Sequence, residues 1–200
     1  MNNSQFKIII IFTLLAVLMA VTRFNHFGSA VTLPDASYAI FFLGGLYLSK
    51  QLRVALIVFI ALILEAGLID VYATSVQGIS DWCMTPAYWF LIPTYGSLWL
   101  AGAWFMRQYT MRGAGLIGLM LAAWAAWAAS SFAFMFSNAT FYLFSDRFAT
   151  MKAIEYTAQV AQYYVSYVSI ALLYIACAVG VHVAYNIIVK QGMDSRSEVV

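Results

Sequence analysis

Long apolar runs separated by short polar segments divide this chain of 200 residues into six stretches. A helix needs about 20 mostly apolar residues to cross roughly 30 Å of hydrocarbon. We therefore predict an all-α protein with six transmembrane helices in a single domain over residues 1–200. The last stretch carries no charge and is long for one crossing, so it should tilt or extend beyond the bilayer. The predicted helices cover approximately residues 6–22, 37–52, 53–72, 86–106, 113–136 and 156–189.

Composition supports an integral membrane protein, since 64% of the residues are hydrophobic and 9% are charged. In soluble domains, roughly 45–50% of the residues are apolar and roughly 25% are charged. The net charge of +2 comes from singly scattered residues without a basic run, which argues against a nucleic-acid partner. No Walker A sequence is present, so we expect no bound nucleotide.

Cationic residues predict the orientation. With both termini in the cytoplasm, seven cations fall on the inner side and three on the outer side, which obeys the positive-inside rule. The inner set is Lys7, Lys50, Arg53, Arg107, Arg112, Lys190 and Arg196, and the outer set is Arg23, Arg147 and Lys152. Arg23 and His26 separate the first apolar run from the small residues 28–30, so we expect a retained helix rather than a cleaved signal peptide.

The segment DWCMTPAYW, residues 81–89, places Cys83 in an outer polar break. The other cysteine, Cys177, lies within the last apolar run, too deep to form a disulfide with Cys83, and we expect it to be a packing residue. No C-x-x-C pair suggests a redox relay. Cys83 is then a soft metal ligand, a nucleophile or a small buried apolar side chain.

Several other outer residues could contact a ligand. His26 can bind a metal or a proton, or it is simply solvated. Asp70 can accept hydrogen bonds from ligand amides, or it merely ends its helix. Tyr88 offers a ring and a hydroxyl at the membrane interface. Arg147 could clamp a phosphate, or it is solvated.

Two features lie within predicted helices. Glu65 is twelve residues beyond Arg53, so it lies about 18 Å into the membrane. An acid there is either functional or protonated and hydrogen-bonded between helices. Ala16 and Ala20 form an A-x-x-x-A pattern, which lets another helix approach closely. That pattern serves internal packing or the docking of a partner subunit.

Three segments together resemble the BtuM family, small bacterial membrane proteins proposed to take up vitamin B12. They are RFNHFGSAVTLPDAS (23–37), Asp70 with its helix end, and DWCMTPAY (81–88). The resemblance covers most of the chain, and the cysteine segment is its most specific part. It implies the six-helix fold of the substrate-binding S-components of energy-coupling-factor (ECF) transporters, in the bacterial inner membrane.

The resemblance also implies the ligand and its chemistry. Cobalamin, or its relative cobinamide, would bind at the periplasmic side, with the Cys83 thiolate as axial cobalt ligand. Cyanocobalamin would lose its cyanide, which makes the protein a transporter and a slow decyanating catalyst. An ECF coupling subunit would dock at Ala16 and Ala20, although the family is thought able to work without it. The residues that the resemblance implies as further cobalamin contacts are His26, Asp70, Tyr88 and Arg147. Asn138 joins them because its side-chain amide can bond to the amide fringe of a corrin.

Two alternatives stay open. The protein could be an S-component for another vitamin that depends on an ECF ATPase module, with Cys83 incidental. It could also be a membrane thiol enzyme such as a thiol-disulfide exchanger, against which stands the missing partner cysteine.

Overall fold

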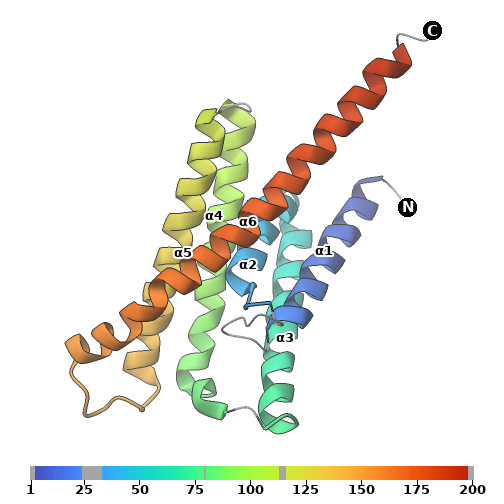
Figure 1. The fold of residues 1–200 in the computed structure, drawn as a ribbon. Coiled ribbons are helices and arrows are strands. Elements are labelled where there is room, and N and C mark those ends of the chain that lie inside the picture. The colour runs from blue at the N-terminus through green and yellow to red at the C-terminus, as the bar shows by residue number, and fades with distance from the viewer. Residues whose placement is uncertain (1–2, 24–32, 79, 113–115, 198–200) are drawn as a thin grey trace.

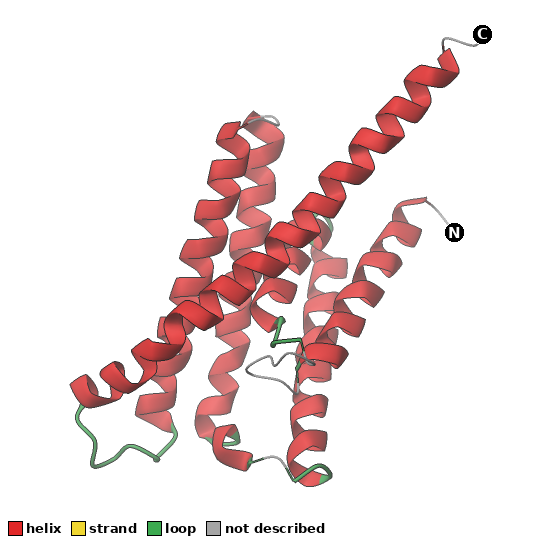
Figure 2. Ribbon diagram, in the orientation of Figure 1, coloured by secondary structure: helices red, strands yellow, loops and turns green. Residues whose placement is uncertain are grey.

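A computed structural model describes residues 3–23, 33–78, 80–112 and 116–197, and within them it contains helices and connections but no strand (Figures 1 and 2). The predicted all-α class is thereby confirmed. The long helices are α1 (Asn3–Thr22), α3 (Leu52–Ser75), α4 (Leu91–Arg112), α5 (Leu116–Phe144) and α6 (Ala153–Ser197). The short ones are α2 (Ser37–Leu48) and the 3-10 helices η1 (Asp81–Cys83) and η2 (Pro86–Phe90).

Four of these helices, α1, α3, α5 and α6, are long and apolar enough to cross a membrane. The other two long apolar runs give different elements. Helix α2 has 12 residues and is about 18 Å long, which is too short to cross roughly 30 Å of hydrocarbon. Helix α4 has 22 residues but is less apolar. The transmembrane character is therefore supported, while the count of six spans stays a prediction.

The helix boundaries differ from the predicted ones mainly at polar ends. Helix α5 ends at Phe144 instead of 136, so Asn138 and Tyr142 lie on this helix and not in an outer loop. The reason is that its polar side chains hydrogen-bond to the preceding turn: the Asn138 amide donates to the Phe134 carbonyl at 2.8 Å, and the Thr140 hydroxyl donates to the Phe136 carbonyl at 2.9 Å. Such bonds satisfy polar side chains without ending the helix.

The other boundary corrections are smaller. Helix α3 continues to Ser75, so Asp70 does not end it, and α4 is preceded by η2 where one helix from residue 86 was predicted. Helix α6 extends from Ala153 to Ser197, beyond the predicted 156–189. Its 45 residues span about 68 Å, and Figure 1 shows it crossing obliquely over the other helices.

The core forms around α2, of which ten of the 12 residues are buried. Glycines allow its close approach to α4. A Cβ atom at Gly45 would collide with the backbone carbonyl of Trp99, and one at Gly102 would collide with the carbonyl of Phe42. The two helix backbones therefore touch directly.

The two ends of the bundle differ (Figure 1). The segment with η1 and η2, which links α3 to α4, lies at the same end as the connection between α5 and α6. The start of α1 and the end of α6 lie toward the opposite end. The loop end is therefore where several chain segments can build a common site.

Candidate functional site

A buried arginine organises the interior near the loop end. Arg23, at the end of α1, is 4% exposed. Its Nε and Nη2 donate to the two carboxylate oxygens of Asp70 at 3.0 and 2.7 Å, which is the bidentate geometry that favours strong pairing. Its Nη1 donates to the hydroxyls of Ser37 at 2.7 Å and Tyr95 at 2.5 Å, and lies 3.9 Å from Asp35. One cation thus links α1, α2, α3 and α4.

Asp70 also connects this network to η2. The Tyr88 hydroxyl donates to an Asp70 oxygen at 2.7 Å, the same oxygen that accepts from Arg23 Nη2. The side chain of Asp70 keeps 19% of its surface exposed. Asp70 is therefore an ion-pair partner that stays within reach of a ligand.

A partly open cavity of about 610 Å³ lies beside this network. Its walls come mainly from α3, the η1–η2 segment, α5 and α6, with contributions from the end of α1, α2 and α4, and they combine aromatic rings with a few polar groups. Four of the residues predicted from the sequence line it together: Asp70, Cys83, Tyr88 and Asn138. A large cavity with a few convergent polar groups is the usual form of a small-molecule site.

Cys83 ends η1, and local hydrogen bonds fix its turn. The backbone N–H of Trp82 donates to the Ser80 hydroxyl at 3.3 Å, and the N–H of Thr85 donates to the Cys83 carbonyl at 2.9 Å. Cys83 is exposed and forms no disulfide, which disfavours the alternative of a small buried apolar side chain.

The surroundings of the Cys83 thiol disfavour its charged form. The cavity walls withdraw the sulfur from bulk water even though the residue keeps exposed surface, and this desolvation raises the pKa of the thiol. The negative charge of Asp70 raises that pKa further, while Arg23 and Arg147 oppose the rise. The thiol is thus mainly protonated at neutral pH until something binds the thiolate.

Arg147 is placed differently from the other predicted residues. It does not line the cavity, and its guanidinium lies over the ring of Trp82, 4.7 Å from the ring centroid. The ring of Phe148 packs edge-on against the same Trp82 at 6.2 Å. The α5–α6 connection therefore holds the residue next to Cys83 through a cation–π contact.

The remaining predicted residues contribute less to this site. His26 lies outside the described residues. Ala16 is half-buried against the core and Ala20 is exposed on α1, so docking of a partner subunit there stays a prediction. Glu65 is partly exposed in the middle of α3. Cys177 is exposed on α6, and its role as a packing residue stays a prediction.

Sequence reasoning missed two parts of the cavity. It counted Arg23 only among the outer charges, because a cation at the end of an apolar run usually extends to the membrane interface, so its position gave no signal for burial. It also missed the aromatic wall from α6. Tyr156, Tyr163 and Tyr167 all line the cavity, and their spacing of seven and four residues places them on one helix face.

Within the described residues, no group of three or more His, Cys, Asp or Glu side chains could hold a bare metal ion. Comparisons of the sequence with protein-family models and with curated proteins gave no match. The function must therefore be argued from the cavity and its chemistry.

Proposed function

We propose that this protein takes up cobalamin across the bacterial inner membrane and binds the cobalt of the corrin through Cys83. The observation that carries the proposal is a single accessible thiol in a large cavity with aromatic walls. One protein ligand is enough for this metal, because the corrin itself supplies four nitrogen ligands. Soft sulfur is a suitable axial donor for such a metal.

The rest of the cavity suits a corrin as well. Aromatic side chains such as Tyr88 and Tyr156 can pack against its face, while Asp70 and Asn138 can bond to its fringe of amides. The volume of about 610 Å³ lies within the roughly 300–1,000 Å³ of small-molecule pockets. Cobalamin is larger than a drug-sized ligand, so we place the corrin ring inside and its nucleotide tail at the open side.

The chemistry of decyanation balances without an oxidant or reductant. The Cys83 thiol loses its proton to solvent, and the thiolate sulfur replaces the lower base on cobalt. Electron donation from sulfur weakens the bond to cyanide on the opposite axial side. Cyanide leaves with the bonding electron pair and takes up a proton, while cobalt stays in the +3 state. A Co–S bond forms, while the Co–N bond to the lower base and the Co–C bond to cyanide break.

The proposal includes the six-segment, S-component-like arrangement in the inner membrane, with both termini cytoplasmic. Helix α4 is then a fifth crossing, and the short α2 reaches only part of the way through the hydrocarbon, enclosed by the other helices. Two observations support this orientation. The distribution of cations is seven inside against three outside. The start of α1 and the end of α6 lie toward the end of the bundle opposite the loop end that carries Cys83. The cavity then faces the periplasm.

The test is the absorbance spectrum of purified protein with cyanocobalamin, compared between wild type, Cys83→Ala and the matched control Cys177→Ala. We expect a shift of the corrin bands, reporting cyanide loss, in wild type and Cys177→Ala and its absence in Cys83→Ala. A corrin that binds unshifted in all three proteins would make Cys83 incidental and favour an S-component-type binder. Failure of any corrin to bind would overturn the proposal.

A further inference from the structure

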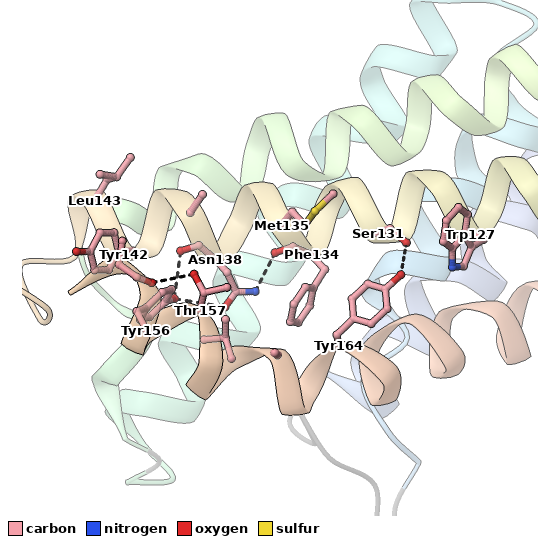
Figure 3. A pocket seen from close by; sticks show the side chains of 14 residues that line it. Trp127, Ser131, Phe134, Met135, Asn138, Tyr142, Leu143, Tyr156, Thr157 and Tyr164 are labelled. Carbon is pink, nitrogen blue, oxygen red and sulfur yellow. Dashed lines mark hydrogen bonds between the residues drawn. The ribbon is translucent and has the colours of Figure 1, made fainter. Parts of the chain in front are cut away.

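A second hollow is lined by side chains of α5 and α6 (Figure 3). This groove has a volume of about 770 Å³. It follows α5 from Trp127 to Leu143, which corresponds to about 24 Å of helix, and α6 from Ala153 to Tyr164. Of its lining, the proposed uptake of a corrin uses only Asn138 and Tyr156.

Apart from the Trp127 indole, the polar side chains of the groove are already hydrogen-bonded within the protein, as the dashed lines in Figure 3 show in part. Ser131 and Tyr164 share a hydrogen bond of 2.7 Å. The Tyr156 hydroxyl donates to the Asn138 carbonyl at 3.1 Å, and the Asn138 amide donates to the backbone of its own helix. The hydroxyls of Tyr142 and Thr157 each donate to a backbone carbonyl at 2.8 Å.

With these donors used, the groove offers an occupant mainly hydrocarbon surface. The rest of the lining is aliphatic or aromatic and includes exposed Met135, Leu143 and Ala161. A ligand that needs hydrogen bonds would leave its own polar groups unpaired there, which costs free energy in an apolar site. The chemistry of the lining therefore selects an apolar chain.

The position of the groove decides the source of that chain. Both walls belong to helices that are long and apolar enough to span a membrane. One leaflet supplies about half of a hydrocarbon core of roughly 30 Å, so an acyl chain of about 15 Å fits within the groove's length. We propose that the α5–α6 groove binds an acyl chain of a membrane phospholipid.

The groove also shares part of its lining with the cysteine cavity. Four residues line both spaces: Phe134, Asn138, Tyr156 and Val160. The wall between the groove and the cavity is therefore one side chain thick at these positions. A bound acyl chain supports this wall from outside, so lipid occupancy and the shape of the cavity are coupled.

The test uses two exposed alanines of α6 that lie three residues apart. Ala161 lines the groove and Ala158 does not, so Ala161→Phe fills the groove while Ala158→Phe adds the same bulk elsewhere. Ala139→Phe fills the groove from α5 and serves as a second variant if the first fails to fold. Each protein is purified in detergent, supplemented with dioleoyl phosphatidylethanolamine and weighed by native mass spectrometry.

We expect wild type and Ala158→Phe to retain one phospholipid that Ala161→Phe and Ala139→Phe lose. Equal lipid retention in all four proteins would overturn the proposal, as would a wild type that retains none. A dimer mass in wild type that both groove variants lose would instead identify a second copy of the chain as the occupant.

Discussion

The ion pair between Arg23 and Asp70 allows a quantitative prediction for Asp70→Asn. The substitution keeps the size of the side chain but removes its charge. Arg23 would remain 4% exposed, with its guanidinium still inside the protein. An uncompensated buried charge is costly because it has lost both water and its counter-ion.

The expected magnitude follows from what remains around Arg23. Removing one partner of a buried pair typically costs about 3–5 kcal/mol. Two features reduce the cost here, since Asp35 stays 3.9 Å from the guanidinium and the new amide oxygen can still accept one hydrogen bond. We therefore expect the lower end, about 3 kcal/mol. For a chain of this length that corresponds to a loss of about 6–12 °C in Tm.

Thermal unfolding of the detergent-purified protein, followed by size-exclusion chromatography, measures this shift. The matched control is Asp81→Asn, an exposed carboxylate on η1 for which we expect a change within about 0.5 kcal/mol. If Asp70→Asn unfolded at the same temperature as Asp81→Asn, the pair would not carry the stability that its geometry indicates.

Two further predictions concern packing and the thiol. Gly45→Ala should destabilise the protein by about 1–3 kcal/mol, because its Cβ would meet the rigid carbonyl of Trp99, whereas Gly180→Ala, with nothing within 4 Å, should unfold no earlier than wild type. A urea or thermal melt that ranks the two equally would contradict direct backbone contact. In a Cys177→Ser background, we expect the rate at which N-ethylmaleimide alkylates Cys83 to keep rising with pH where the rate for the denatured protein has reached its plateau. The reason is that burial raises the pKa of the thiol. Identical pH profiles of the alkylation rate for native and denatured protein would show that burial does not raise the pKa of this thiol.

Much of the helical framework follows from the sequence, because apolar runs in lipid must satisfy their backbone groups within a helix. The ends of helices do not follow from apolarity alone. Asn138 looks like a loop residue, yet its amide bonds to the preceding turn and α5 continues. The burial of α2 inside the protein was not predictable either, since an apolar sequence looks the same whether lipid or protein surrounds it.

The site was predictable as a set of residues but not as a geometry. Cys83, Asp70 and Tyr88 lie in one outer segment of the chain or beside it, so their shared cavity agrees with the sequence pattern. The partner of Asp70 could not be predicted, because Arg23 is 47 residues away and becomes a neighbour only when α1 packs against α3. The contact of Arg147 with Trp82 likewise depends on how two connections fold back at the same end.

The arrangement around Arg23 also bears on how the chain is made. Arg23 emerges from the ribosome 47 residues before Asp70, its bidentate partner. At about 5–20 residues per second, a nascent chain carries this cation without that counter-ion for several seconds. The end of α1 can settle inside the protein only after α3 has been synthesised. The first four helices should therefore assemble as one cooperative unit during insertion, and a chain truncated before Asp70 should leave α1 undocked.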